Sequence, residues 1–471
     1  MFIHFTDIIN NLINYIKSKL LVNPENTTNS EIFQNLFNKI YEERCKTIQS
    51  ELLPDVLPIV DDVYVIGDIH GDYDKLIKLL VKSNVISIEE INNTEINNEH
   101  LNIIKINNKK VIQDKVIQDT NVIQDTKVIK DKNQIIRWIG KESVVVQVGD
   151  QIDRCRENCD SNQTDDKNDD WKILKFMTLL NEISNQYNGK VYSLLGNHEI
   201  MNTQYNFNYV SKKGKDNFLE DYDKNYLNQF NKNINDNENI KNTREYAFKI
   251  GNEISNFLAC TRKLCIIVGS NVFVHGGITS YIAQKYNVYD MNTIVNLYLF
   301  DSLKLSELNN NNKIKKIADV AIGDLLSINT TRLNSYLSPI WNRDLNNLLL
   351  DINEDKQMPK WIRNLNGVPK KNCKKLNDNL QIFFNNSRNN ISPLYKNNIS
   401  PLYKNTVVKV GSIIVGHTPQ LKDGQIKSRC DNKVWLTDYG SSIAFKNYKN
   451  DTWPKIQVLH IHKDNIFKII S

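Results

Sequence analysis

Short apolar runs, each closed by a glycine-containing turn, recur along the chain. They are rich in Val and Ile and lie at 63–71, 143–154, 191–199, 271–278, 412–419 and 434–442. Continuous β-branched runs of this kind, bounded by Gly, are typical of strands buried on both faces. We therefore predict that each run begins with a buried strand and ends in a turn.

Helical periodicity separates some of these runs. In residues 72–82 the side chains of Leu76, Leu79 and Leu80 fall on one side of a helix, and residues 171–187 show the same apolar spacing. Strand, helix and strand in alternation predict an α/β fold. In such folds ligands bind beyond the carboxyl ends of the strands, where the polar turns of this chain lie.

Polar tracts rich in Asn, Asp and Lys interrupt the pattern, and one holds the near-repeat VIQDK VIQDT NVIQDT KVIKD. We expect surface insertions there, since periods of five to eight residues in so few copies do not make a solenoid. Residues 1–55 are expected to be a helical extension whose first helix packs on the domain that follows at 56–471. The expected insertions lie near 91–133, 155–170, 205–243, 306–316 and 345–406.

Composition and charge exclude several classes of protein. Of the 471 residues 40% are hydrophobic and 9% aromatic, enough for a sizeable core, so a wholly disordered chain is excluded. The 60 Lys and Arg against 54 Asp and Glu leave a net charge of only +6, which gives no reason to expect a dedicated nucleic-acid binder. No apolar stretch reaches the length of roughly 18 residues that a membrane span requires.

The seven cysteines are an odd number spread over a long chain, unlike the dense framework of a small secreted domain. This favours a reducing compartment, and we expect a cytoplasmic protein. For Cys155 and Cys159 a redox clasp or an extra metal ligand is conceivable, but two plain thiols at the edge of an insertion are favoured. For Cys260 and Cys265 buried thiols are favoured over a disulfide.

Several metal-ligating side chains stand at the predicted strand ends. They are Asp68 and His70, Asp150, Asn197 and His198, His275, and His417. Carboxylate, imidazole and amide groups without Cys suit divalent Mn, Fe or Zn. Because a carboxylate such as Asp150 is able to bridge and the candidates exceed the needs of one open site, two ions are expected.

The motifs GDIHG, GDQIDR, GNHE, VHGG and GHT, in this order, resemble the signatures of the calcineurin-like metallophosphoesterases, in their phosphoprotein phosphatase branch. The segments SPIWNRD and TDYGSS further resemble the Shewanella-like, bacterial-type protein phosphatases. The resemblance extends from about residue 61 to 444. It implies an αββα sandwich of two mixed β-sheets flanked by helices, with long low-complexity insertions, and a metal-dependent phosphatase.

The resemblance also implies two metal ions that share Asp150. The ligands of the first ion would be Asp68, His70 and Asp150. The ligands of the second would be Asp150, Asn197, His275 and His417. A water between the ions would attack phosphorus directly, without a phosphoenzyme.

Three further residues receive roles from the resemblance. His198, held in its charged form by Asp153, would protonate the leaving alkoxide. Arg154 would grip the phosphate, because a guanidinium binds phosphate oxygens bidentately. Arg343, in SPIWNRD, is a candidate second phosphate ligand or, equally, a structural ion pair.

We expect a substrate that is a phosphorylated protein, at Ser, Thr or Tyr. The alternatives are a hydrolase of dinucleoside tetraphosphates and an inactive phosphatase-like binding protein; the replacement of the family's usual Gly by Cys155 keeps the last one open. Near the C-terminus, His460 and His462 alternate on one strand face. They are a possible metal pair, but a surface strand is favoured because no third partner is near them in the sequence.

Overall fold

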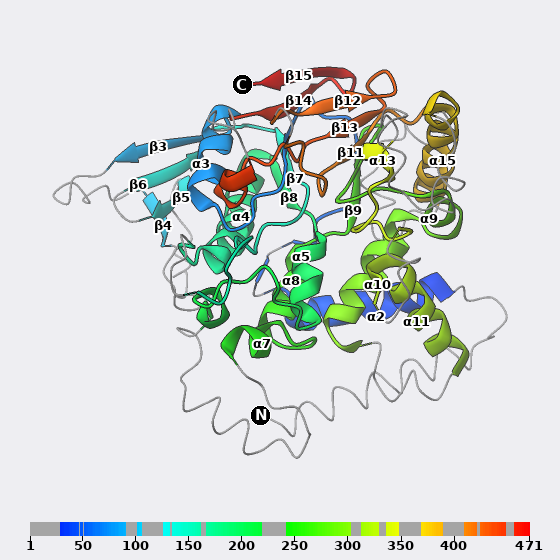
Figure 1. Cartoon of the computed structure of the whole chain (residues 1–471), viewed down its shortest axis with the longest axis horizontal. Coiled ribbons are helices and arrows are strands. Elements are labelled where there is room, and N and C mark those ends of the chain that lie inside the picture. Colours follow the sequence, from blue (N-terminus) through cyan, green and yellow to red (C-terminus); the bar gives the residue numbers. More distant parts are fainter. Residues whose placement is uncertain are drawn as a thin grey trace, which may run out of the picture.

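The computed structural model describes fourteen parts of the chain: 29–46, 48–49, 51–90, 101–105, 126–131, 134–161, 166–218, 242–302, 312–328, 336–347, 369–389, 409–421, 424–448 and 456–471. The amphipathic helix predicted near the N-terminus, and most of the insertions predicted at 91–133, 205–243 and 345–406, lie outside these residues. In the described part, two mixed β-sheets stack between helical layers (Figure 1). The αββα sandwich is therefore confirmed.

The first sheet has five strands in the order β15-β14-β2-β7-β8. Three are parallel, and β14 and β15 are added antiparallel at one edge. The helices α3 and α4 cover its outer face with Leu76, Leu80 and Ile173, which are fully buried, as the periodicity predicts. The bounds are β2 Asp62–Ile66, α3 Tyr73–Lys82, β7 Val144–Gln147, α4 Asp170–Ser184, the 3-10 turn η1 Asn185–Tyr187, β8 Lys190–Ser193, β14 Val458–His462 and β15 Ile466–Ile470.

The second sheet has six strands in the order β1-β9-β10-β11-β13-β12. It contains the three remaining predicted strands, and helices pack on its outer face. The strand bounds are β1 Val56–Leu57, β9 Cys265–Val268, β10 Asn271–Val274, β11 Ile413–Val415, β12 Lys427–Arg429 and β13 Val434–Leu436. The helix bounds are α2 Asn29–Arg44, α8 Glu253–Thr261, α9 Ser280–Lys285, α10 Val288–Leu299, α11 Asn312–Leu326 and α15 Pro369–Asn389.

Apolar side chains from both sheets meet in one core. Val65 and Val146 of the first sheet are fully buried, as are Phe273 and Ile414 of the second. Burying a side chain of this size stabilises the fold by about 1.5–3 kcal/mol. This packing holds the two sheets in a fixed relation, and with them the turns at their strand ends.

A third sheet corrects one expectation. Its four strands, in the order β3-β6-β5-β4, include two from the repeat-bearing tract that we expected to be a surface loop. Val128 and Ile129 of β5 are fully buried, and β5 contacts α4. The Val-Ile pair of the last repeat unit, Val128 and Ile129, supplies the β-branched surface that this strand needs. The bounds are β3 Ile86–Glu90, β4 Leu101–Lys105, β5 Thr126–Asp131 and β6 Gln134–Trp138.

Two further segments contribute to the core. Helix α15, from the tract predicted as an insertion, buries Leu380, Phe383 and Phe384, and α2 of the N-terminal extension buries Phe33 and Phe37 in the same cluster. No described helix has the length and apolar character of a membrane span. The remaining short elements are α5 Asn197–Thr203, η2 Gly214–Asp216, α7 Thr243–Phe248, α13 Asp344–Asn347 and η7 Ile443–Tyr448.

The cysteines differ most from expectation. Three disulfides form, Cys45–Cys260, Cys155–Cys159 and Cys373–Cys430, and Cys265 is a buried free thiol. The expectation of plain thiols at Cys155, Cys159 and Cys260 is therefore wrong, and the argument for a reducing compartment loses its basis. Partners such as Cys45 and Cys260, 215 residues apart, are brought together only by packing of α2 against α8.

The disulfides predict a thiol count. Air-oxidised protein, denatured without a reductant and treated with iodoacetamide, should take up one alkyl group, on Cys265. After reduction it should take up seven, one for each Cys. Intact-mass and peptide mass spectrometry measure both numbers, and uptake of three or more groups before reduction would contradict the pairing.

Candidate metal centre

The carboxyl ends of strands from both sheets meet at one place. Asp68 follows β2, Asp150 follows β7, and Asn197 opens α5 just beyond β8. From the other sheet, His275 follows β10 and His417 follows β11. All five side chains are buried, with at most 4% of each residue exposed. The residues that the sequence predicted as metal ligands are thus brought together.

Asp150 lies in the middle of this group. Its Oδ2 is 3.2 Å from Nε2 of His275, 3.8 Å from Nε2 of His198 and 4.0 Å from Nε2 of His70. Two sets of possible metal ligands share it: His70, Asp150 and His198, and Asp150, His275 and His417. The carboxylate that was predicted to bridge therefore lies between the two sets.

The other predicted ligands flank these sets. Oδ2 of Asp68 is 3.9 Å from Nε2 of His70, on the first side. On the second side, Oδ1 of Asn197 is 3.0 Å from Nε2 of His275, whose ring centre is 5.0 Å from that of His417. The backbone N–H of His417 donates to the Asp68 carboxylate at 3.1 Å and so links the two sides.

Backbone carbonyls fix the orientation of the imidazoles. Nδ1 of His275 donates to the Val148 carbonyl at 2.8 Å, and Nδ1 of His70 is 3.3 Å from the Ile152 carbonyl. In His417 the roles of the nitrogens are exchanged, because Nε2 is 3.2 Å from the Trp341 carbonyl. Each ring thereby keeps its other nitrogen for the cluster, which is the usual arrangement of metal-binding histidines.

The strained backbone of the turns also belongs to the site. His70, Asp150, Asp153 and His417 all have positive φ, at 45°, 53°, 70° and 67°. Non-glycine residues adopt this region at a cost of about 1–3 kcal/mol, and such residues cluster at functional sites. At Gly196 a Cβ would lie 2.1 Å from Oδ1 of Asp150, so only glycine permits this approach.

Glu199 holds two of these turns together, a role that we did not predict from the GNHE motif. Its buried carboxylate accepts three backbone N–H groups: those of Asp150 at 3.1 Å, Gln151 at 2.8 Å and Gly196 at 2.8 Å. Burial and the Asp150 charge raise the pKa of Glu199. The turns after β7 and β8 are thereby locked in register.

His198 belongs to a buried polar chain beside the cluster. Nδ1 of His198 is 2.9 Å from Oδ2 of Asp153, which also accepts from the side chain of Asn202. Arg244 donates to Oδ1 of Asp153 at 2.7 Å and pairs with Asp170 at 2.8 Å. Arg244, of α7, is completely buried, and no sequence motif indicated it.

Two arginines, Arg154 and Arg156, follow Asp153, and the charge of Arg156 acts on the groups of the cluster. Its charge acts on Asp153, Asp150 and Asp438 and, after burial, is the largest cause that lowers the pKa of His70. Arg154, the predicted phosphate ligand, instead lies near the carbonyl of Gly71, with Nη1 at 3.5 Å. Only Arg154 is within the family motif, so no pattern in the sequence indicated Arg156.

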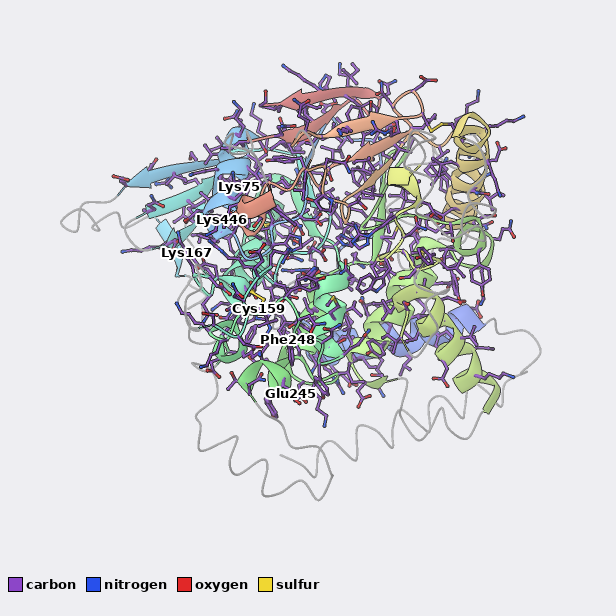
Figure 2. The ribbon with its side chains drawn as sticks, in the orientation of Figure 1. Lys75, Cys159, Lys167, Glu245, Phe248 and Lys446 are labelled. Atoms are coloured by element: carbon purple, nitrogen blue, oxygen red, sulfur yellow. A yellow bond between two sulfur atoms is a disulfide. The ribbon has the colours of Figure 1, made fainter. Side chains whose placement is uncertain are left out.

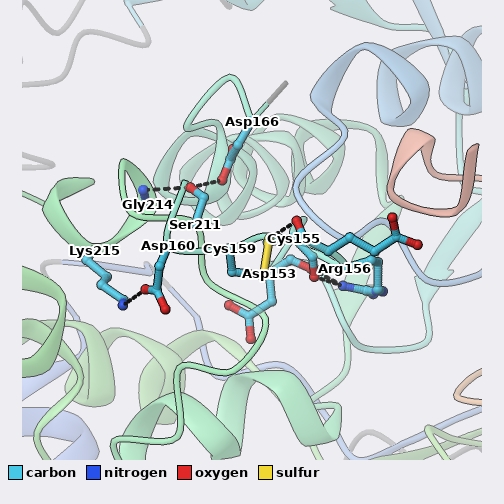
Figure 3. Close-up of a disulfide and its surroundings, with 10 residues drawn as sticks. Asp153, Cys155, Arg156, Cys159, Asp160, Asp166, Ser211, Gly214 and Lys215 are labelled. Carbon is cyan, nitrogen blue, oxygen red and sulfur yellow. Dashed lines mark hydrogen bonds and ion pairs between the residues drawn. A yellow bond between two sulfur atoms is a disulfide. The ribbon is translucent and has the colours of Figure 1, made fainter. Parts of the chain in front are cut away.

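Aromatic rings and a disulfide hold Arg156 in place. Its guanidinium lies over the rings of Tyr209, at 5.1 Å, and Phe445, at 4.8 Å. Nη1 donates to the backbone carbonyls of Asp153 and Cys155, as Figure 3 shows beside the Cys155–Cys159 bridge. Figure 2 places Cys159 within the whole molecule.

Arg343 stands on the opposite side of the cluster. Its side chain is exposed, and Nη1 donates to the His417 carbonyl at 2.9 Å and to Oγ1 of Thr418 at 3.2 Å. Burial and then the Arg343 charge lower the pKa of His417. Within the described residues no acidic side chain pairs with it at ion-pair distance, so the structural ion pair is not found there.

The charge distribution fits bound cations. Asp68, Asp150 and Asp438 are buried together; burial and the Asp438 and Asp150 charges raise the pKa of Asp68. Burial and the Asp150 charge raise the pKa of Asp438 to about 6, although the hydrogen bond from the Gly440 N–H lowers it. Burial alone would raise the pKa of Asp150, but the charges of His275 and His198 hold the pKa of this carboxylate well below its usual range.

Two acceptor arrangements support the same conclusion. Oδ2 of Asp438 is buried without a hydrogen-bond partner in the described part of the chain. Oxygens of Asn197 and Asp150 both face Nε2 of His275, whose Nδ1 donates to the Val148 carbonyl. Burial alone would lower the pKa of His275, but the Asp150 charge raises it, so that a proton on Nε2 satisfies both oxygens. A divalent cation would take the place of that proton, and the residues present therefore fit divalent metals.

Comparisons with known proteins agree with this chemistry. Residues 128–421 match the family model of calcineurin-like phosphoesterases. An uncharacterized protein of Acanthamoeba polyphaga mimivirus is 29% identical over 304 residues, which cover 63% of this chain and 98% of that protein. Shewanella-like protein phosphatase 2 of Arabidopsis thaliana is 40% identical over 82 residues, 17% of this chain and 18% of that one.

Solved structures are similar at low sequence identity. A cold-active protein-tyrosine phosphatase of a psychrophilic Shewanella species has 17% identity and a TM-score of 0.45, over 89% of this chain and 83% of that one. A protein serine/threonine phosphatase of Saccharomyces cerevisiae has 10% identity and a TM-score of 0.37, over 98% and 96%. Because the match to the family model covers more than half of the chain, the chain belongs to the calcineurin-like phosphoesterases and is a metal-dependent phosphatase.

Proposed function

We propose that this phosphatase removes phosphate from phosphorylated Ser, Thr or Tyr residues of proteins. The observation that carries the proposal is the position of Asp150, shared by two sets of buried ligands, with His198 beside it. A site with two cation positions and a separate imidazole suits phosphomonoester hydrolysis by direct attack of water. The Shewanella-like phosphatase segment in Arabidopsis supports a protein substrate.

We assign the metal ligands as the sequence predicted them. Asp68, His70 and Asp150 would hold one ion, and Asp150, Asn197, His275 and His417 the other. Two divalent ions, of Mn, Fe or Zn, would neutralise the phosphate oxygens and lower the pKa of the attacking water. His198 is close enough to Asp150 to be a ligand in a purely geometric search, but its hydrogen bond to Asp153 supports a different role.

In the proposal His198 is the general acid. Because a carboxylate only accepts, the 2.9 Å contact with Asp153 places the proton of Nδ1 between them. In the imidazolium form a second proton is on Nε2, and this is the proton that would pass to the leaving oxygen. Arg244 and Asn202 keep Asp153 in this position. Protonation matters because the alkoxide of Ser or Thr is a poor leaving group, and a positioned acid contributes about 10²–10⁴-fold.

Two arginines on opposite sides of the cluster would bind the phosphate. Arg343 stands beside His417 and Arg156 beside His70. Arg156 uses Nη1 for backbone carbonyls, and in the described residues no hydrogen bond engages its Nη2 or Nε, so these donors are left for phosphate oxygens. Arg154 retains the role implied by the family motif as the competing assignment.

His198→Ala tests the acid. We expect kcat for a phosphoserine peptide with added manganese to fall by about 10²–10⁴-fold, since the alkoxide then departs unprotonated. The metal content, measured by inductively coupled plasma mass spectrometry, should stay at the wild-type value. Asp150→Asn is the matched control, because it should lose both metal and activity. Full activity of His198→Ala would contradict the assignment.

The substrate class is tested with the wild-type enzyme. Release of phosphate from phosphoserine, phosphothreonine or phosphotyrosine peptides should proceed with Mn, Fe or Zn, while a dinucleoside tetraphosphate should react poorly. The opposite preference would favour the tetraphosphate hydrolase. Lack of turnover of every phosphate ester, in protein shown to contain two metal ions, would favour the binding protein.

The arginines are compared by single substitution. Arg156→Ala and Arg343→Ala should each lower kcat/KM by about 10–150-fold, the loss of one charge-assisted contact of roughly 1.5–3 kcal/mol. Arg156→Lys should recover only part of the loss, because Lys lacks the fork. Thermal unfolding of each variant controls for stability. A larger effect of Arg154→Ala than of Arg156→Ala, in equally stable proteins, would return the role to Arg154.

A further inference from the structure

A second group of metal-ligating side chains lies on the outer face of the five-stranded sheet. Asp62 is at the start of β2, and His460 and His462 are on β14. Across the antiparallel pair, His462 is directly opposite Asp62 and His460 is opposite Tyr64. The partner that the two histidines lacked in the sequence is thus supplied by a strand about 400 residues away.

The three side chains converge on one point. Nε2 of His460 is 2.7 Å and Nδ1 of His462 is 2.8 Å from the same oxygen, Oδ1 of Asp62. Their candidate ligand atoms all lie within 4.8 Å of one another. Two imidazoles and a carboxylate are the three-ligand set typical of zinc sites that keep an open coordination position. A cation that replaced the protons of the two hydrogen bonds to Asp62 would bond to both imidazoles and to the carboxylate.

The surroundings orient the ligands and leave room for solvent. The His460 ring stacks on the ring of Tyr64, with centres 4.7 Å apart and planes inclined by 11°. The side chains of His460, Asp62 and His462 are 19%, 32% and 38% exposed, so water has access to a bound ion. Lys468 is opposite His460 on β15, but it is exposed and its charge is solvated.

This group is separate from the dinuclear cluster. Asp62 begins β2 and Asp68 follows its end, so the two carboxylates are about 20 Å apart at roughly 3.3 Å per residue of extended chain. None of the three residues belongs to the ligand sets around Asp150. A metal here would neither bind the substrate phosphate nor replace an ion of the cluster.

We propose that Asp62, His460 and His462 form a third metal site, selective for a divalent transition metal such as Zn²⁺. The bound ion fastens the antiparallel β14 strand to β2, and so adds a cross-link between the C-terminal hairpin and the start of the catalytic sheet. A metal that binds only the folded state raises the free energy of unfolding, and the gain grows with the logarithm of the ratio of the free metal concentration to Kd. The site is therefore structural, independent of turnover.

Metal stoichiometry tests the proposal. Chelator-stripped protein, titrated with Zn²⁺ by calorimetry and measured by inductively coupled plasma mass spectrometry, should bind three ions per chain. Asp62→Asn and His462→Gln should each bind two and lose the Zn²⁺-dependent rise in melting temperature, with phosphatase activity unchanged. Asp61→Asn, the same charge change at the neighbouring exposed residue, is the matched control and should bind three.

A measurement on the wild-type protein does not depend on the folding of variants. Diethyl pyrocarbonate should modify His462 in stripped protein, and Zn²⁺ should lower that modification at least tenfold, as mapped by peptide mass spectrometry. Unprotected His462 at saturating Zn²⁺, or equal stoichiometry in wild type and Asp62→Asn, would overturn the proposal. Loss of activity with three ions still bound would concern the dinuclear cluster and not this site.

Discussion

The need to keep buried carboxylates together governs this structure. Asp68, Asp150 and Asp438 lie in one group with almost no access to solvent, where like charges repel strongly and hydration cannot compensate. Imidazoles around Asp150 offset part of the repulsion, and bound divalent cations would offset the rest. The turns, the glycine contacts and the surrounding hydrogen bonds all serve to hold these groups where cations bind them.

A second layer of buried polar groups makes the arrangement rigid. Glu199 fixes the turns after β7 and β8 through three backbone N–H groups, and Arg244 fixes Asp153 behind His198. These contacts are formed in the absence of solvent, so each one is strong and its loss would leave an unpaired charge. The predicted metal ligands keep their strained, positive φ values because the many contacts of these buried polar groups leave the turns no other conformation.

The parts outside the motifs have chemistry of their own. The disulfide between Cys155 and Cys159 closes the loop that carries Arg156, and two aromatic rings position the guanidinium toward the cluster. On the outer face of the five-stranded sheet, Asp62 joins the two histidines of β14. Both features lie on segments that the family motifs do not cover, and both arise from contacts between distant parts of the chain.

The sequence by itself determined the six strands that lead to the site, the helices α3 and α4, and the polar residues at the strand ends, because local periodicity and turn chemistry act over a few residues. Only the tertiary structure decided which distant groups meet: Cys45 with Cys260, Arg244 with Asp153, and Asp62 with His460. It also buried the last Val-Ile pair of the repeat, in β5, since burial depends on a neighbouring sheet and helix. Such pairings follow from packing between elements far apart in the chain, and no local pattern encodes them.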